Sequence, residues 1–200
     1  MAKIPPFDSN SVLPPHLGDP TCGDQVSPYP CTSQELCERF STSPERIKIL
    51  GGFLRLRTEL RKCGMTLGFQ WLDGSFLEDV ENIEAREPKD IDVVTFYWHA
   101  DPAFSTNLLA AFPDLANPGK IRTDYFVDHY VVDAGYHPAG TVAQTSYWYG
   151  LFSHTRPGVW KGMLRVDLDT QSDDTEAMKV LVARSTPPII LAPTHDETRK

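Results

Sequence analysis

The sequence predicts an α+β (α/β-like) domain in which helices flank a mixed β-sheet. Strand-like apolar runs alternate with segments that carry helix start and stop signals, which is the pattern of such folds. A chain of 200 residues, 40% of them hydrophobic, is long enough to form one core without disulfides or a structural metal. We expect an irregular proline-rich arm over residues 1–30, a single domain over residues 31–186 and a polar tail over residues 187–200.

The N-terminal arm is expected to be extended and to lie on the domain. Residues 1–30 hold seven of the seventeen prolines, which oppose a regular helix, and several apolar residues that need cover. Thr32 or Ser33 then caps a short helix that runs to Phe40.

A longer helix is expected after Ser43. The capping serine, Pro44 at the first helical position and Glu45 in the first turn form a strong start signal, and the helix should run to Lys62. Its positive residues are expected to form a solvated face, and they are Arg46, Lys48, Arg55, Arg57, Arg61 and Lys62.

The rest of the chain is expected to alternate strands with helices. Strands are predicted at residues 66–72, 91–98, 125–132 and 163–168. Helices are predicted at residues 103–112 and 175–183, turn residues at 113–119, and an acidic loop or helical turn at 77–87.

Two aspartates stand at the head of the most strand-like segment, IDVVTFYW. Asp90 and Asp92 project to the same face of an extended chain, with Cα atoms about 6.5 Å apart, because side chains alternate. Two anions on a partly desolvated face repel each other unless a divalent cation lies between them. Oxygen ligands suit Mg²⁺ or Mn²⁺, so the pair predicts a hard-metal site.

A Gly-Ser pair after the apolar run FQWL is the second candidate feature. Gly74 lacks a side chain, which lets backbone N–H groups approach phosphate oxygens, and the hydroxyl of Ser75 adds a donor. A phosphate site and a metal site in one short segment together indicate phosphoryl transfer.

A third carboxylate would complete such a site, because it can hold a second cation or accept the proton of an attacking hydroxyl. The run TDYFVDHYVVD offers Asp124, Asp128 and Asp133. Counting in steps of two puts Asp124, Asp128 and Tyr130 on one face and His129 on the other. Asp128 is our candidate, because an acid among apolar residues is costly unless it is paired or metal-bound. A structural ion pair with Arg or Lys stays the alternative.

Two other polar features are interpreted as structural. Asp167 and Asp169 form a second Asp-x-Asp pair, but they alternate with apolar residues as on a half-exposed edge strand. His129, on a valine-rich face, is expected to be a core residue. The sequence contains no GxxxxGKS or GxGxxG motif, which excludes the P-loop and Rossmann classes of nucleotide site.

The segment SYWYGLFSHTRPGVWKG, residues 146–162, is expected to be a long loop. One interpretation is that its aromatic residues stack on a nucleobase while its cations contact a triphosphate. The other is a loop packed by its own aromatic residues. The candidates for nucleotide contact are Tyr147, Trp148, Tyr149, Arg156 and, as our first choice, Lys161.

Charge and cysteine content limit the functional classes. A net charge of -8 argues against a protein that coats nucleic acid nonspecifically. The N-terminus has no apolar signal segment, and no stretch approaches the about 20 apolar residues of a membrane span, so we expect a cytoplasmic protein. The spacing of the cysteines does not match a zinc motif and favours reduced thiols at Cys22, Cys31, Cys37 and Cys63.

The blocks GSF and PKDIDVV, followed by an acid within VDHYVV, resemble the nucleotidyltransferase superfamily. This group includes DNA polymerase beta, CCA-adding enzymes, aminoglycoside nucleotidyltransferases and small MNT-type antitoxins, and the resemblance covers about residues 66–132. IPPFDSNSVLPP and LFSHTRPGVWKGMLRVDL are also similar to an uncharacterised bacterial and phage group of small nucleotidyltransferase-like proteins. The fourteen residues between Ser75 and Asp90 form a longer interval than in many members, and we expect no separate substrate-binding domain.

The resemblance implies a nucleotidyltransferase fold in which Gly74 and Ser75 bind nucleotide phosphates. It also implies that Asp90 and Asp92 hold two Mg²⁺ ions and that Asp128 is the third acid. Such an enzyme would transfer a nucleoside monophosphate from an NTP to an unknown hydroxyl acceptor on a protein, a tRNA or a small molecule. The alternative is a nucleotide- or partner-binding module without turnover, like an antitoxin or a phage-defence protein.

Overall fold

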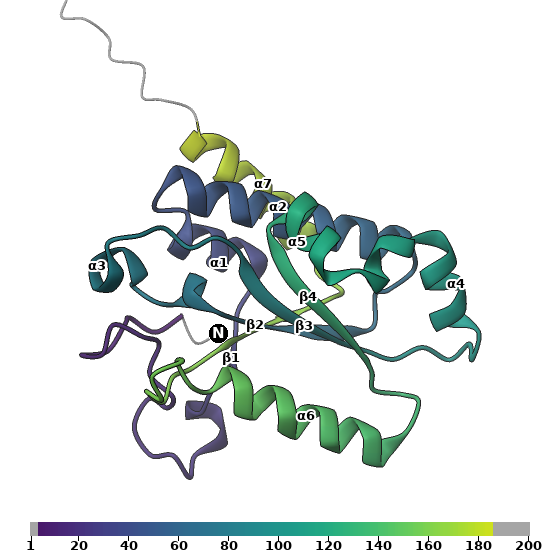
Figure 1. Cartoon of the computed structure of the whole chain (residues 1–200), viewed down its shortest axis with the longest axis horizontal. Helices are drawn as coiled ribbons and strands as arrows, with labels where there is room; N and C mark the ends of the chain where they lie inside the picture. The colour runs from purple at the N-terminus through teal and green to yellow at the C-terminus, as the bar shows by residue number, and fades with distance from the viewer. Residues whose placement is uncertain (1–3, 186–200) are drawn as a thin grey trace, which may run out of the picture.

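The computed structural model describes residues 4–185, which fold around a five-stranded mixed β-sheet (Figure 1). The strands are β1 (Tyr29–Pro30), β2 (Gly68–Asp73), β3 (Ile91–Tyr97), β4 (Val127–Asp133) and β5 (Leu164–Asp167). They lie in the order β1-β5-β2-β3-β4. Strand β2 is antiparallel to β3 and β5, whereas β3 is parallel to β4 and β1 is parallel to β5. The expected α+β class with a mixed sheet is confirmed.

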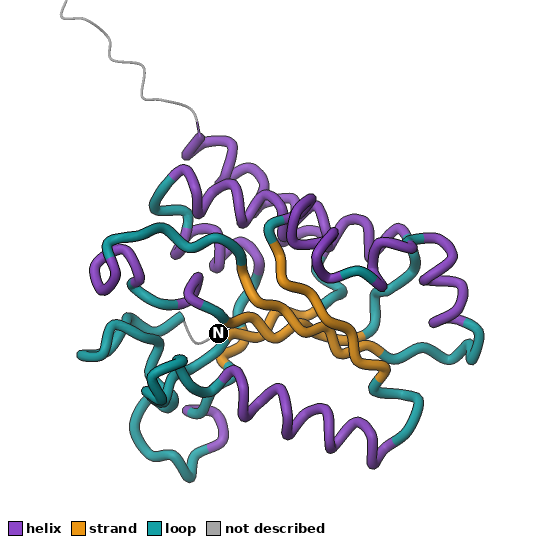
Figure 2. Tube along the Cα trace, viewed as in Figure 1, coloured by secondary structure: helices purple, strands orange, loops and turns teal. Residues whose placement is uncertain are grey.

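The seven α-helices of the described residues divide unevenly between the two faces of the sheet. They are α1 (Ser33–Phe40), α2 (Pro44–Lys62), α3 (Val80–Glu84), α4 (Phe104–Ala111), α5 (Pro118–Tyr125), α6 (Pro138–Phe152) and α7 (Gln171–Ser185). Helices α1, α2, α5 and α7 lie above the sheet in the view of Figure 1, and α6 crosses the face below, as Figure 2 also shows. No helix within residues 4–185 is long and apolar enough to cross a membrane.

Two apolar cores follow from these two layers. The larger core lies between the upper helices and one face of the sheet, to which Val93 contributes. The smaller core joins Val94 and Trp71 to Trp148 and Phe152 of α6. Because side chains alternate along a strand, β3 supplies neighbouring valines to opposite cores.

The first two helices start at the capping residues that the sequence predicts. Thr32 and Glu35 form a capping box at the start of α1. At α2 the side chain of Ser43 accepts a hydrogen bond from the backbone N–H of Arg46, and Pro44 is the first helical residue. Each cap satisfies a backbone donor that would otherwise lack a partner in the first turn.

The expectation that the cations of α2 form a solvated face is wrong for two of them. Arg46 and Arg57 are only 2% and 1% exposed. Arg46 pairs with Glu81 and donates to the carbonyl oxygen of Phe76 at 2.6 Å, so it fastens the segment after β2 to α2. Arg57 pairs with Asp174 of α7 at 2.9 Å.

The turn expected over residues 113–119 and the strand expected from residue 125 are partly wrong. Pro113–Ala116 form a 3-10 helix, and α5 follows with Asn117 as its capping residue. Phe126 ends α5 in the left-handed region, with φ of 59°, before β4 begins. Asp124 therefore lies in a helix, so counting in steps of two does not place it.

The loop expected over residues 146–162 is wrong over its first part, because α6 extends to Phe152. The side chain of His137 caps α6 by accepting a hydrogen bond from the backbone N–H of Gly140, and Pro138 follows it. This is the same start signal as at α2. Helix α6 contains no charged residue, and it runs back along the sheet from the end of β4.

The described part of the N-terminal arm lies on the domain. Val12 and Leu13 are buried, and the carbonyl oxygen of Leu13 accepts a hydrogen bond from the backbone N–H of Gly162 at 2.7 Å. Tyr29 brings the arm into the sheet as β1. The tail expected over residues 187–200 lies outside the described residues.

Candidate functional site

Aspartates of three neighbouring strands form a row on the α6 face of the sheet. Asp73 ends β2 and lies opposite Asp92 of β3, and Asp92 in turn lies next to Asp128 of β4. Paired residues of adjacent strands point to the same face. Asp90, two residues before Asp92, lines the same cavity. The structure thus brings the three expected acids together and adds Asp73 as a fourth.

These acids line a cavity of about 780 Å³, a volume within the range of small-molecule sites. The turn at Gly74 and Ser75 borders the acids. Further charged residues around the cavity are Glu78, Glu84, Arg86, Lys89, Arg122, Arg156 and Lys161. Its aromatic wall, supplied by β4 and α6, consists of Tyr130, Tyr147, Trp148 and Phe152.

Asp92 is a half-buried carboxylate that forms no ion pair with another described residue. Within the described part of the chain its side chain makes no hydrogen bond and no ion pair. Burial, followed by the charges of Asp90 and Asp128, raises the pKa of Asp92 to about 6. Burial also raises the pKa of Asp90, although Arg122 opposes that shift. The negative charge at the centre of the row is therefore poorly compensated by the protein.

Gly74 is required by the close approach of Asp92. Its φ of +87° lies in a region that favours glycine, and a Cβ atom added there would stand 2.5 Å from Oδ2 of Asp92. The absent side chain leaves the carboxylate beside the backbone of the turn. Gly74 and Ser75 therefore lie where the sequence predicts, next to the acids.

Lys161 is buried and already paired, which bears on its expected role at the nucleotide. Its side chain is 2% exposed, and its Nζ lies 3.0 Å from Oδ1 of Asp73 and 2.6 Å from Oε1 of Glu78. It also donates to the carbonyl oxygen of Gly74 at 3.4 Å. Lys161 thus ties both ends of the turn over residues 73–78 together.

Burial shifts the pKa values of Asp73 and Lys161 in opposite directions. Burial raises the pKa of Asp73 to about 7, even though Lys161 lowers it. Burial also lowers the pKa of Lys161, but the charges of Asp73 and Glu78 outweigh it, so this pKa lies above its ordinary value. Lys161 therefore stays protonated and serves as an internal counter-charge.

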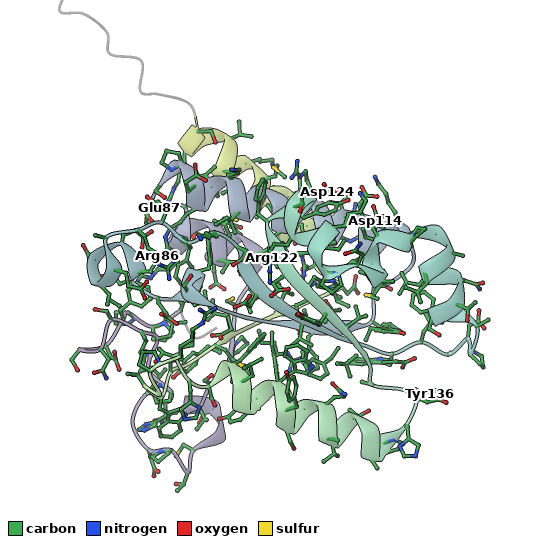
Figure 3. All side chains as sticks on the ribbon, in the orientation of Figure 1. Arg86, Glu87, Asp114, Arg122, Asp124 and Tyr136 are labelled. Carbon is green, nitrogen blue, oxygen red and sulfur yellow. The ribbon has the colours of Figure 1, made fainter. Side chains whose placement is uncertain are left out.

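Arg122 connects two of the predicted acids. This residue of α5 places Nε 3.0 Å from Oδ2 of Asp90, and its guanidinium also pairs with Oδ2 of Asp128. Figure 3 labels Arg122 beneath α5, near the beginnings of β3 and β4. Its side chain is 51% exposed, so it covers the acids from the solvent side.

The donors suit a hard cation, although an arginine stands among them. Oδ1 of Asp128 is buried and has no hydrogen-bond partner within residues 4–185, and the carboxylate of Asp92 is likewise unpaired. Such oxygens fit Mg²⁺ or Mn²⁺. As they stand, however, no three His, Cys, Asp or Glu side chains of the described residues are grouped to hold a metal ion. The guanidinium of Arg122 supplies the positive charge between Asp90 and Asp128 instead.

The rim of the cavity carries two cations that have no ion-pair partner among the described residues. Lys89 and Arg156 form no ion pair with another described residue, although both lower the pKa of Asp90 by their charge. Cations at an open rim favour an anionic ligand. The positive charge that Lys161 cannot offer to a ligand is thus available from these two side chains.

The aromatic wall has exposed rings on a buried support. Tyr130 and Tyr147 are 39% and 59% exposed, and their ring centroids lie 4.9 and 5.0 Å from that of Trp148. Trp148 itself is buried. Of the three expected stacking candidates, Tyr147 is thus an exposed ring of the cavity wall, Trp148 supports it, and Tyr149 contacts Trp71 in the smaller core.

Four residues of the site are not proposed from the sequence, namely Asp73, Lys89, Arg122 and Tyr130. Asp73 directly precedes Gly74, and its alternation with Trp71 places it on the acid face once β2 is extended by one residue. The sequence indicates Arg122 as a site residue only if Asn117-Pro118 is interpreted as a helix start. Arg122 then lies in the last turn of a helix that leads directly into β4 and Asp128.

The features interpreted as structural lie away from the acids. His129 is buried on the opposite face, where its Nε2 lies 2.7 Å from Oγ1 of Thr95, and burial lowers its pKa to about 3. Asp167 forms an exposed pair with Arg165, and neither Asp167 nor Asp169 lines the cavity. The four cysteines are free thiols.

Comparison with known proteins gives a family but no activity. The chain matches the model of DUF6932, a family of unknown function, over residues 5–167, which include every residue of the cavity. No match was found among curated proteins or among solved structures.

Proposed function

Since the chain belongs to this family of unknown function, we propose an activity from its site: Mg²⁺-dependent transfer of a nucleoside monophosphate from an NTP to a hydroxyl acceptor. The observation that carries the proposal is the row of Asp73, Asp92 and Asp128 beside the turn at Gly74. Within the described chain Asp92 forms no ion pair and Asp128 has an oxygen without a hydrogen-bond partner, as expected for carboxylates that act on a ligand. The resemblance to the nucleotidyltransferase superfamily points the same way.

Asp90, Asp92 and Asp128 are the residues that would hold Mg²⁺. Bound there, the ion would neutralise phosphate charge and orient the reacting groups. Gly74 allows phosphate oxygens to approach the backbone of the turn, and the hydroxyl of Ser75 donates to them.

The rim cations Lys89 and Arg156 would contact the outer phosphates. Both line the cavity and form no ion pair with a described residue, so a polyphosphate gains their charge without breaking an ion pair within residues 4–185. Lys161 contributes indirectly, because it holds the turn over residues 73–78 in place.

Asp128 is positioned to take the proton of the acceptor. Its buried Oδ1 has no partner among the described residues and can accept a hydrogen bond from a hydroxyl group. As that O–H bond breaks, the hydroxyl oxygen forms a bond to the α-phosphorus of the NTP. The bond from the α-phosphorus to the bridging oxygen breaks, and pyrophosphate leaves.

The aromatic wall suits the base of the nucleotide. Tyr130 and Tyr147 expose their rings on the support of Trp148, and a planar base can stack on them. Tyr130 lies two residues after Asp128 and on the same face of β4, so the base and the acids would be neighbours.

The test is transfer of label from NTPs radiolabelled at the α-phosphate, incubated with Mg²⁺ and cell lysate. We expect a labelled protein, RNA or small molecule and release of pyrophosphate, both lost in Asp92→Asn. Asp169→Asn, outside the cavity, is the matched control and should keep the activity. Full turnover by Asp92→Asn would end the proposal.

A nucleotide-binding module without turnover is the second candidate. Arg122 pairs with two of the acids, which favours a protein that binds a nucleotide but does not process it. Calorimetry with an NTP and Mg²⁺ measures binding, and a separate assay with lysate measures pyrophosphate release. Binding without pyrophosphate release supports the module, and binding with release supports the transferase.

A further inference from the structure

We propose that Arg122 is the resident counter-cation of the acid row and that a divalent ion binds by displacing it. Arg122 thereby sets the metal affinity of the site. The proposal rests on the metal site of the proposed function. It explains why the donors suit Mg²⁺ chemically although no three acids of the described residues are grouped to hold a metal ion.

The contacts of Arg122 are those that a metal ion would take over. One guanidinium bridges Asp90, just before β3, and Asp128 of β4, using Oδ2 of each. It leaves Oδ1 of Asp128 and the whole carboxylate of Asp92 unpaired within the described residues. A single positive charge thus pairs with two carboxylates and leaves the third, Asp92, without an ion pair to a described residue. A divalent ion carries more charge and can also satisfy the carboxylate of Asp92, which Arg122 does not reach.

Arg122 can leave the acids at modest cost. Its side chain is 51% exposed, so its guanidinium is already in contact with solvent and can exchange carboxylate contacts for water. It lies in the last turn of α5 on a long side chain, so the backbone need not move. It also lines the cavity, which keeps the released cation near an anionic ligand.

The buried Lys161 shows why this role falls to Arg122. Lys161 also contacts one acid of the row, Asp73, but it is 2% exposed and has Glu78 as a second carboxylate partner. Removal of its head group from these partners would leave buried charges without water. Lys161 is therefore a permanent counter-charge, and Arg122 is the exchangeable one.

The test is a Mn²⁺ titration of the full chain, followed by the decrease of the electron paramagnetic resonance signal of free Mn²⁺. Arg122→Gln removes the competing charge and is expected to bind Mn²⁺ about tenfold more tightly than the wild type. Arg165→Gln is the control, because it makes the same change of charge at an exposed ion pair outside the cavity. Its Mn²⁺ affinity should equal that of the wild type.

Thermal melting provides a second readout, because recovery of the melting temperature by Mn²⁺ is not expected if Arg122 is purely structural. Without metal, Arg122→Gln should melt below the wild type, because two carboxylates lose their counter-cation, and Mn²⁺ should restore the difference. Arg122→Lys keeps the charge but loses the bidentate geometry of the guanidinium. Its affinity for Mn²⁺ should therefore lie between those of the wild type and Arg122→Gln.

The outcomes separate the two proposals. Equal Mn²⁺ affinity of the wild type and both Arg122 variants overturns the role of Arg122 and leaves the metal site standing. Absence of Mn²⁺ binding in all of them removes the metal site and this proposal with it.

Discussion

Two arginine–carboxylate clusters on opposite faces of the sheet differ in how completely they are satisfied. On the upper face Arg57 is 1% exposed and contacts both oxygens of Asp174, and it donates to Gln70 at 2.6 Å and to Thr170 at 2.7 Å. On the α6 face Arg122 is half exposed and contacts two carboxylates, one of which keeps a buried oxygen without a partner in the described chain.

This difference in hydrogen-bond satisfaction distinguishes a structural cluster from a candidate binding site. A buried charge network that satisfies every member joins elements rigidly, and the Arg57 cluster joins α2, β2 and α7. A network with unused oxygens has a free energy that a ligand can still lower. The same residue types thus indicate a structural joint in one place and a candidate site in the other.

The largest expected effect comes from breaking the satisfied cluster. Asp174→Asn leaves Arg57 and Arg61 without their buried anion, and it should lower the free energy of unfolding by about 3–5 kcal/mol in urea denaturation. Asp167→Asn breaks only an exposed ion pair with Arg165 and should change the free energy of unfolding by about 0.5 kcal/mol or less. Similar losses in both variants would contradict the contrast between the clusters.

Lys161→Met is expected to have the next largest effect. It removes the counter-charge of Asp73 and Glu78, and we expect a loss of about 3 kcal/mol in the free energy of unfolding. Adding Asp73→Asn removes the carboxylate that has lost its counter-charge, so the double variant should recover part of the lost stability. The measurement is a double-mutant cycle in urea, and strict additivity of the two changes would show that Lys161 does not hold the turn through Asp73.

Asp92→Asn should increase the free energy of unfolding, because it removes a charge that lacks an ion-pair partner in the described chain. With a pKa of about 6 in the folded state, Asp92 binds its proton more tightly than in the unfolded chain, so wild-type stability falls as the pH rises from about 4 to 6. The variant lacks this loss. In the presence of a chelator it should be more stable than the wild type by about 1–3 kcal/mol at pH 7.

The pH series provides the internal control for that variant. Below about pH 3 the wild-type carboxyl is protonated in both states, so the unfolding curves of the two proteins should converge. A variant less stable than the wild type at pH 7 would mean that unseen partners compensate Asp92, and the α6 face would then resemble the Arg57 cluster.

Gly74→Ala tests the smallest effect, the contact between the turn and Asp92. The new Cβ would meet Oδ2 of Asp92 at 2.5 Å in a backbone with positive φ, and we expect a loss of about 1–2 kcal/mol and weaker Mn²⁺ binding. Gly158→Ala has a similar φ of +89° but open space around the added atom. It should lose about 1 kcal/mol and keep its Mn²⁺ affinity, so equal Mn²⁺ binding by the two variants would separate Gly74 from the acids.

Local signals predicted much of the fold and part of the site. Ser43-Pro44 marks α2 correctly, and the strand-like run IDVVTFYW places β3 with Asp92 near its start. The same kind of signal at Asn117-Pro118 and His137-Pro138 starts α5 and α6, but proline and glycine also fit turns, so composition alone does not decide between them.

By itself, the sequence determined which residues can act together locally: Gly74 with Ser75 in the turn, and Asp90 with Asp92 on one face of a strand. Only the tertiary structure decided that Asp73 joins them, that Arg122 bridges Asp90 and Asp128, and that Lys161 is used internally. The physical reason is that strand register and helix packing are set by contacts between residues far apart in the chain. Those contacts decide whether a charge finds its partner inside the protein or has to find it in a ligand.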